Sequence, residues 1–211
     1  FTMRKKSDAD RLKDYLDSTN LPAEEQHVVI VGGGLLGLEL AAALKHKKVK
    51  ITIIQRASRL MERQLDRISS KLLAEEVQLR DIQIYFDNEV STVFETDNSN
   101  ELEIALKSGR ILTANAIVYT IGTIPNIEIA KESGLSCGRG VKVNQYLQTS
   151  NPNIFAIGEI AEFNNRLFGI TSAAEEQADM LANFRAGAIS SLSKGSVLIN
   201  LMKLEDINMV R

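Results

Sequence analysis

A glycine-rich turn between two apolar segments constrains the fold of this chain most. The apolar run 27–31 leads into the turn, the helix-forming segment 38–44 follows it, and the turn itself consists of Gly32, Gly33, Gly34, Leu35, Leu36 and Gly37. In a GxGxxG spacing the first glycine permits a tight turn, the second lets the backbone approach a phosphate, and the third allows close helix packing. Because a helix N-terminus presents unpaired N–H groups, the pattern predicts a site for the diphosphate of a dinucleotide. The competing interpretation is a purely structural turn.

Strand and helix segments alternate after this turn. Apolar strands are expected over 49–54 and 82–86. Apolar side chains at helical spacing mark a helix between these strands: Leu65, Ile68, Leu72 and Leu79. Strands that alternate with helices build parallel sheets, so the first part of the chain predicts an α/β fold of Rossmann type.

The hydrophobic period then changes to two. Residues 90–96, 101–107 and 110–112 are expected to form three antiparallel strands joined by polar turns. The continuous apolar run 116–121 has the composition of a strand that returns to the parallel sheet. A three-stranded antiparallel meander is therefore predicted as an insertion in the parallel sheet.

The segment after Gly122 follows a different pattern and predicts a domain boundary near that residue. A turn at 149–153 leads into an apolar strand expected over 154–157, and a helix is expected over 173–186. The N-terminal residues 1–20 are expected to be a polar lead-in with a short amphipathic helix.

Composition excludes several function classes. The net charge of -2 provides no basic field for nucleic acid or an anionic membrane. No apolar run reaches membrane-spanning length and no signal-peptide pattern occurs, so a cytoplasmic location is expected. Cys137 is the single cysteine and His27 and His46 are the only histidines, so neither a disulfide nor a metal site is expected.

Three motifs in this order resemble the pyridine nucleotide–disulfide oxidoreductase family. They are the glycine turn with Glu39, the turn with Gly122 and Pro125, and the pair Gly158-Glu159 after an apolar run. Two further strings, 59–66 and 164–169, resemble the large subunit of the NAD(P)H-dependent nitrite reductases in that family.

The resemblance implies a flavoprotein that takes hydride from NAD(P)H to FAD and passes electrons to nitrite-reducing iron–sulfur and sirohaem centres. Residues 21–121 would be the NAD(P)-binding domain and 122–211 the C-terminal part of the FAD-binding domain. Residues 1–20 would be a remnant of an earlier FAD-domain segment or a linker. The cofactors carry the electron chemistry, while the protein binds and orients them.

The resemblance also implies roles for single residues. The glycine turn would hold the nicotinamide cofactor's pyrophosphate, and Gly122 and Pro125 would belong to a cofactor-binding turn. Glu39 would lie by the nicotinamide and the flavin; a partner for the helix dipole in the first turn is its alternative. Gly158 and Glu159 occupy the place of the family's Gly-Asp, whose carboxylate accepts hydrogen bonds from the flavin ribityl chain.

The position of the adenosine ribose departs from the usual pattern. An acidic residue that binds the 2′-hydroxyl is expected about 20 residues after the first glycines. Here Gln55 and Arg56 end the second strand. Gln55 can bond a ribose hydroxyl, while Arg56 and Arg59 could bind a 2′-phosphate. The choice between NADH and NADPH therefore stays open, with the resemblance favouring NADH.

A second departure concerns the flavin. The sequence has one glycine-rich turn, whereas the resemblance implies another for the pyrophosphate of FAD. FAD binding is therefore expected to be incomplete, and the chain alone to be inactive without the missing FAD-domain half and the downstream iron–sulfur and sirohaem domains. Rubredoxin or ferredoxin reductases, NADH oxidases and a non-catalytic dinucleotide-binding module remain as alternatives.

Overall fold

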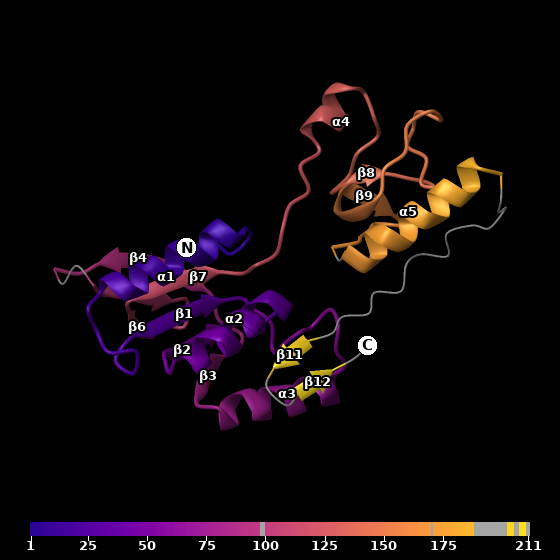
Figure 1. Cartoon of the computed structure of the whole chain (residues 1–211). Helices are drawn as coiled ribbons and strands as arrows, with labels where there is room; N and C mark the ends of the chain where they lie inside the picture. Colours follow the sequence, from indigo (N-terminus) through magenta and orange to yellow (C-terminus); the bar gives the residue numbers. More distant parts are fainter. Residues whose placement is uncertain (98–99, 170, 188–201, 205–206, 210–211) are drawn as a thin grey trace. The chain divides into compact units, whose positions relative to one another are not determined.

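The computed structural model describes residues 1–97, 100–169, 171–187, 202–204 and 207–209 (Figure 1). Contacts divide the chain into two compact units. The first consists of Phe1–Ile121 with Leu201–Val210, and the second is built from Gly122–Asn200. The glycine turn lies in the first unit and the Gly158-Glu159 pair in the second.

A four-stranded parallel sheet forms the centre of the first unit (Figure 1). Its strand order is β3-β2-β1-β7, with β1 at His27–Val31, β2 at Lys50–Ile54, β3 at Ile82–Tyr85 and β7 at Ala116–Tyr119. The crossover helices are α2, Leu35–His46, and α3, Arg67–Leu79. All three strand pairs are parallel, so the α/β prediction is confirmed.

Alternation along β1 assigns its side chains to two different hydrophobic clusters. Val28 and Ile30 pack in the cluster that holds buried residues of the helices, namely Leu12, Leu16, Leu38, Ala41, Leu44, Leu73 and Val77. Val29 packs instead in a cluster with Ile104 and Leu106 of the antiparallel strands. Because successive side chains point to opposite faces of a sheet, helices cover one face and the antiparallel strands cover the other. This double burial explains why the strand sequences are continuously apolar.

The antiparallel strands form the predicted meander. They are β4 at Val90–Glu95, β5 at Leu102–Leu106 and β6 at Ile111–Ala114, paired in that order in a sheet of their own. The meander lies between β3 and β7 along the chain. The prediction of a three-stranded insertion in a parallel α/β fold is therefore confirmed.

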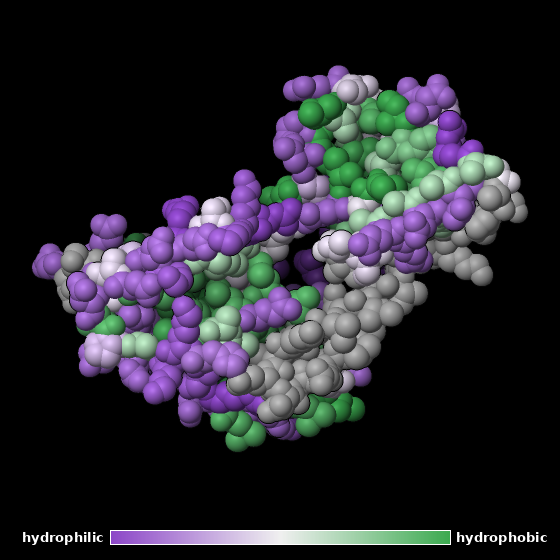
Figure 2. Space-filling view, viewed as in Figure 1, coloured by the Kyte–Doolittle hydropathy of each residue, from purple (hydrophilic) through white to green (hydrophobic). Residues whose placement is uncertain are grey.

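Three of the apolar side chains that mark α3 in the sequence lie on its exposed face. Ile68, Leu72 and Leu79 are 75%, 58% and 76% exposed. Figure 2 shows apolar surface at its lower edge, where α3 lies in Figure 1. The buried residues are Ser70, Leu73 and Val77. On this buried face the Ser70 hydroxyl donates to the Leu60 carbonyl over 2.7 Å.

The N-terminal residues pack within the first unit. The helix α1, Lys6–Ser18, buries Leu12 and Leu16. The ring of Phe1 lies 5.3 Å from that of Tyr15, and the Phe1 carbonyl accepts a hydrogen bond from the Tyr119 amide. The start of the chain is thereby joined to the edge of β7.

The second unit combines short strands with one long helix. It contains α4 at Glu128–Glu132, β8 at Val141–Lys142, a 3-10 turn at Gly158–Ile160, β9 at Ala161–Phe163, β10 at Arg166–Leu167 and α5 at Thr171–Arg185. β9 pairs with β8 in parallel and with β10 in antiparallel orientation. The helix predicted over 173–186 is α5.

The strand predicted over 154–157 does not form. Ile154 closes a turn by donating to the Asn151 carbonyl over 3.0 Å, and Ala156 donates to the Leu147 carbonyl over 3.1 Å. Phe155 makes only an isolated bridge with Gln148. The tight turn folds this segment back on residues 147–149, so its apolar side chains do not enter a larger sheet.

Two short strands follow further along the chain. β11, Met202–Leu204, pairs with β12, Ile207–Met209, in antiparallel orientation. Within the ranges that the structure describes, no helix has both the length and the apolar character needed to cross a membrane.

Candidate functional site

The glycine turn lies at the carboxyl end of β1. Gly32 has a φ of +115°, which other residues rarely adopt, and its N–H donates to the Ile54 carbonyl over 2.8 Å. Gly34 is the N-cap of α2, and a Cβ built on it meets no atom within 4 Å. The turn thus has a rigid base and an open surface at Gly34.

The first residues of α2 provide hydrogen-bond donors. The first internal bond of the helix runs from the Leu38 N–H to the Gly34 carbonyl over 3.1 Å. The N–H groups of Leu35, Leu36 and Gly37 therefore have no carbonyl partner within the helix. Together with the helix dipole they form an environment that favours an anion.

Close packing accounts for the third glycine. A Cβ on Gly37 would lie 2.0 Å from the Gly32 carbonyl oxygen and 2.8 Å from the Thr120 hydroxyl. The Thr120 hydroxyl in turn lies 3.1 Å from the Gly32 carbonyl. Sequence analysis did not identify Thr120; the signal that was available is a hydroxyl residue at the end of a buried strand.

Gln55 connects the glycine turn to the loop after β2. Its Oε1 accepts the Gly33 N–H over 2.8 Å, and its Nε2 donates to the Arg59 carbonyl over 3.0 Å. The Gly33 carbonyl also accepts the Met61 N–H over 2.9 Å. Gln55 is 8% exposed, so both ends of its amide are engaged inside the protein. The Gly33 N–H is therefore directed to Gln55.

The two arginines after β2 differ in their surroundings. The Arg56 side chain is 76% exposed, with its Nε 3.9 Å from the Glu89 carboxylate. Arg59 donates from its guanidinium to the Glu62 carbonyl over 2.9 Å. The Arg59 Nε is buried and, in the described part of the chain, has no hydrogen-bond partner. Both cations lie close to the end of β2.

Glu39 is the fifth residue of α2, and the first turn of that helix contains no acidic residue. The alternative that it is a first-turn partner of the helix dipole is therefore wrong. Partial burial raises the pKa of the Glu39 carboxyl, because desolvation penalises the charged form. A carboxyl with a raised pKa in the helix that begins at the glycine turn suits a role next to a bound group.

In the second unit, two predicted motifs lie together. The Thr123 hydroxyl donates to the Glu159 carboxylate, which joins the segment after Gly122 to the Gly158-Glu159 pair. Gly122 has a φ of +99° and is exposed, whereas Pro125 is buried. Thr123 was not identified from the sequence, because a lone hydroxyl in a turn carries no periodic signal.

The Gly158 turn is fixed by α5. Gly158 has a φ of +73°, and its buried N–H donates to the Gln177 Oε1 over 2.7 Å. Gln177 is 1% exposed. A Cβ on Gly158 would lie 3.3 Å from the Ala174 Cβ, so the turn lies directly against the helix.

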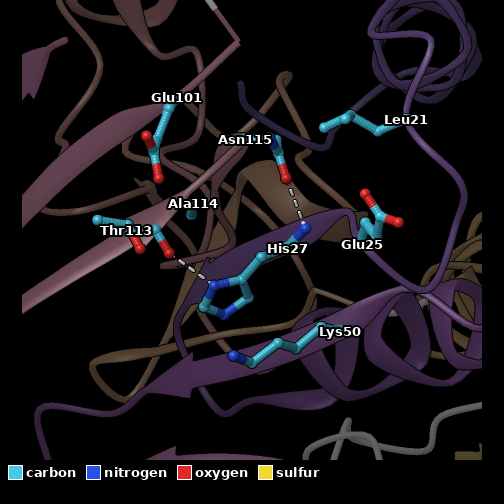
Figure 3. A pocket seen from close by; sticks show the side chains of 8 residues that line it. All are labelled: Leu21, Glu25, His27, Lys50, Glu101, Thr113, Ala114 and Asn115. Carbon is cyan, nitrogen blue, oxygen red and sulfur yellow. Dashed lines mark hydrogen bonds between the residues drawn. The ribbon is translucent and has the colours of Figure 1, made fainter. Parts of the chain in front are cut away.

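A separate cavity of about 260 Å³ lies at the amino ends of β1 and β2, the edge opposite the glycine turn (Figure 3). His27 lines it, and its Nδ1 lies 2.6 Å from the Thr113 carbonyl while its Nε2 lies 2.9 Å from the Thr52 hydroxyl. Because a carbonyl only accepts, the bond to Thr113 assigns the proton to Nδ1. His27 thus links the parallel sheet to the meander by hydrogen bonds.

We expect this link to make stability depend on pH. Burial lowers the pKa of His27, and the nearby Lys50 lowers it further, although the bond to Thr113 opposes both effects. Since the unfolded chain binds the proton more readily, the contribution of His27 is complete above about pH 6.5 and is lost as the pH falls below that value. The melting temperature of the wild type should therefore fall as the pH is lowered below about 6.5, and that of His27→Gln should depend less on pH. The same dependence of the melting temperature on pH in both proteins would contradict the assignment.

In the described ranges, no group of three or more His, Cys, Asp or Glu side chains is arranged so that it could hold a metal ion. Cys137 is a free, half-buried cysteine whose backbone forms a bridge with Val141. Each unit therefore has its own candidate site: the glycine turn with its supporting residues in the first, and the Gly158-Glu159 turn in the second.

Comparison with known proteins gives the family. The chain is 34% identical over 191 residues to a nitrite reductase [NAD(P)H] of Bacillus subtilis, and 31% identical over 189 residues to an assimilatory nitrate reductase electron transfer subunit of the same organism. Each match covers 90% of this chain and 24% of the relative, so the chain spans about a quarter of their length.

The fold agrees with these sequences. Putidaredoxin reductase, solved in covalent complex with putidaredoxin, is similar with a TM-score of 0.84 at 25% identity, over 98% of this chain and 49% of that protein. The family model for pyridine nucleotide-disulphide oxidoreductases matches residues 1–178. The chain is therefore a member of the pyridine nucleotide-disulphide oxidoreductase family, whose enzymes use FAD and NAD(P)H.

Proposed function

We propose that this chain is the electron-input part of a flavin-dependent oxidoreductase and binds NAD(P)H at the glycine turn of its first unit. The observation that carries the proposal is the open space at Gly34 above the N-terminus of α2. A side chain would fill this space, whereas a diphosphate can enter it and reach the first N–H groups of the helix. The residues present thus fit the cofactor.

Each residue of the turn has a distinct part. The N–H groups of Leu35, Leu36 and Gly37 would bind the pyrophosphate, and Gly34 would leave room for it. Gly32 and Gly33 hold the shape of the turn through their bonds to Ile54 and Gln55, respectively. Gln55 is therefore proposed as a positioning residue instead of a direct ligand of the ribose.

Glu39 is proposed as the carboxyl that lies by the nicotinamide. The nicotinamide supplies a hydride and the flavin accepts it. Glu39 is itself exposed, but desolvation raises its pKa, so it can carry a proton at a higher pH than a fully solvated glutamate. Its own contribution would be to orient the reacting ring and to hold or release that proton.

The second unit is proposed to hold part of the flavin site. The Glu159 carboxylate, positioned by Thr123, can accept hydrogen bonds from hydroxyl groups of the ribityl chain. Gly158 and Gln177 keep the turn in place, and Gly122 and Pro125 shape the segment that carries Thr123. Residues 21–121 would then be the NAD(P)-binding domain, 122–211 the C-terminal part of the FAD-binding domain, and 1–20 a linker that packs on the first.

We further propose a nitrite-reductase type of electron acceptor. The two curated relatives at 31% and 34% identity, which belong to nitrate and nitrite reduction, support it. A ferredoxin-type reductase is the second candidate, because putidaredoxin reductase has the same fold. A non-catalytic module would bind the nucleotide without reducing flavin, so following NADH oxidation with FAD after the missing FAD-domain half is restored separates it from both enzymes.

The glycine turn can be tested by a single methyl group. Gly34→Ala should weaken NADH and NADPH binding by about tenfold or more, since the methyl occupies the phosphate space, while the thermal transition stays unchanged because nothing lies within 4 Å. Isothermal titration of the whole chain measures the affinity. Gly169→Ala is the matched control, because its Cβ also meets open space. Unchanged affinity in Gly34→Ala, or no association at millimolar nucleotide, would refute the proposed site.

A further inference from the structure

The cavity at the amino ends of β1 and β2 has no part in the proposed nucleotide site (Figure 3). Its volume is about 260 Å³, and it lies in the first unit at the edge of the parallel sheet opposite the glycine turn. Three of its lining side chains are charged, namely Glu25, Lys50 and Glu101. Glu25 precedes β1, Lys50 is the first residue of β2, and Glu101 directly precedes β5. Three separate segments thus bring these charges to one cavity.

The three charged side chains do not pair with one another. Within the residues that the structure describes, no ion pair or hydrogen bond joins the Lys50 Nζ to Glu25 or to Glu101. Figure 3 shows the three side chains on different sides of the His27 ring, with Lys50 below it, Glu25 to the right and Glu101 above. Opposite charges that line one cavity without contact can bind a ligand that carries groups of both signs.

Two neutral side chains of the lining, His27 and Asn115, already have partners. The Asn115 Oδ1 accepts the His27 N–H over 2.7 Å, and the Asn115 Nδ2 donates to the Asn100 carbonyl over 2.6 Å. Both ring nitrogens of His27 are engaged as well. These bonds hold this wall of the cavity in place before a ligand arrives, so ordering it costs little on binding.

Charge and volume define the chemistry that the cavity suits. Two carboxylates and one ammonium give its lining one negative charge in excess. His27 adds no positive charge at about pH 7.5, because burial lowers its pKa. A ligand with two cationic groups and one carboxylate therefore balances the lining. With about 30 Å³ for each water-sized group, the cavity has room for about nine non-hydrogen atoms.

We propose that this cavity binds a small diamino acid, a molecule with one carboxylate and two ammonium groups on a short aliphatic chain. The Lys50 ammonium binds the carboxylate of the ligand, and Glu25 and Glu101 each bind one of its ammonium groups. Such charge-assisted hydrogen bonds are about twice as strong as those between neutral groups. Leu21 and Ala114, which also line the cavity, suit the aliphatic chain. The site is separate from the glycine turn and does not depend on nucleotide binding.

Three probes that differ by one charged group test the proposal. L-ornithine carries all three groups, L-norvaline lacks the side-chain amine, and putrescine lacks the carboxylate. In isothermal titration of the whole chain at about pH 7.5 and low salt, L-ornithine should bind about tenfold or more tightly than either of the others. Comparable affinities for the three probes, or no binding of L-ornithine at about 10 mM, would overturn the proposal.

Substitutions of the charged residues should act on different probes. Lys50→Gln should remove the preference for L-ornithine over putrescine, because it removes the partner of the carboxylate. Glu25→Gln and Glu101→Gln should each weaken L-ornithine binding by about tenfold. Glu24→Gln is the matched control, because Glu24 pairs with Lys48 at 3.5 Å and does not line the cavity. It should bind L-ornithine as the wild type does.

Nuclear magnetic resonance of the histidine rings locates the bound probe. The sequence contains two histidines, His27 and His46, and only His27 lines the cavity. L-ornithine should shift the ring resonances of His27 and leave those of His46 in place. Unmoved His27 resonances, or a Lys50→Gln variant that still prefers L-ornithine over putrescine, would show that the diamino acid does not bind in this cavity as proposed.

Discussion

Gly37→Ala should destabilise the first unit by about 3 kcal/mol and abolish NAD(P)H binding. The added methyl would lie 2.0 Å from the Gly32 carbonyl oxygen and 2.8 Å from the Thr120 hydroxyl. The first of these is a backbone atom of the turn itself, so α2 must move away from β1 to relieve the overlap. We expect the thermal transition of that unit to fall by about 10 °C, measured by circular dichroism or calorimetry.

The contrast with Gly34→Ala makes this result specific. The two glycines belong to the same turn, but only the Gly37 position is filled by neighbouring atoms. Loss of binding with loss of stability is expected for Gly37→Ala, and loss of binding alone for Gly34→Ala. A Gly37→Ala variant that melts like the wild type would show that α2 and β1 are not packed as closely as described here.

Gln177→Leu should destabilise the second unit by about 2 kcal/mol, because it leaves a buried N–H without an acceptor. Gln177 is 1% exposed and accepts the Gly158 N–H over 2.7 Å. Leucine has a similar size but no acceptor, so the Gly158 turn would separate from α5. Denaturant unfolding followed by hydrogen exchange at the Gly158 amide would measure both effects.

Gln177→Met provides the control for shape. Methionine matches the length of glutamine and its sulfur is only a weak acceptor, so it should be nearly as destabilising as leucine. If Gln177→Leu and Gln177→Met both retain wild-type stability and slow exchange, the Gly158 N–H must have another acceptor. The turn would then be held by its own backbone.

The parallel sheet was predictable because its sequence signals are continuous. The apolar runs of β1, β2 and β7 are buried on both faces, and such runs have few alternatives to a central parallel strand. The meander was predictable from a different pattern, because its apolar residues alternate with a period of two, unlike those of the surrounding segments. Both signals arise from burial, which governs many residues at once.

The segment 154–157 was mispredicted as a strand, and the apolar spacing that marks α3 does not identify its buried face, because polar contacts take part in both. Ser70 lies on the buried face, where its hydroxyl reaches the Leu60 carbonyl, an interaction that an apolar count cannot register. Residues 154–157 have the composition of a strand, but the turn bond from Ile154 to Asn151 directs them back on the chain. Hydrophobic patterns specify segments, whereas specific polar contacts specify the way in which they turn.

The candidate site shows the same limit. The spacing of Gly32, Gly34 and Gly37 was sufficient to predict the turn and its position at the start of a helix. It could not show that both ends of the Gln55 amide are engaged, or that Thr120 lies below the turn. The contacts of Gln55 with Gly33 and of Thr120 with Gly32 join residues 22 and 88 positions apart in the sequence, and no local pattern records them.

The support of the glycine turn by residues at the ends of two strands, β2 and β7, has a consequence for association. Its backbone is bonded to Ile54 at the end of β2, to the Gln55 side chain, and to Thr120 after β7. The shape that a nucleotide meets thus exists before the encounter. The turn would therefore lose little conformational entropy on binding, so ordering it would subtract little from the binding free energy between its amides and a diphosphate.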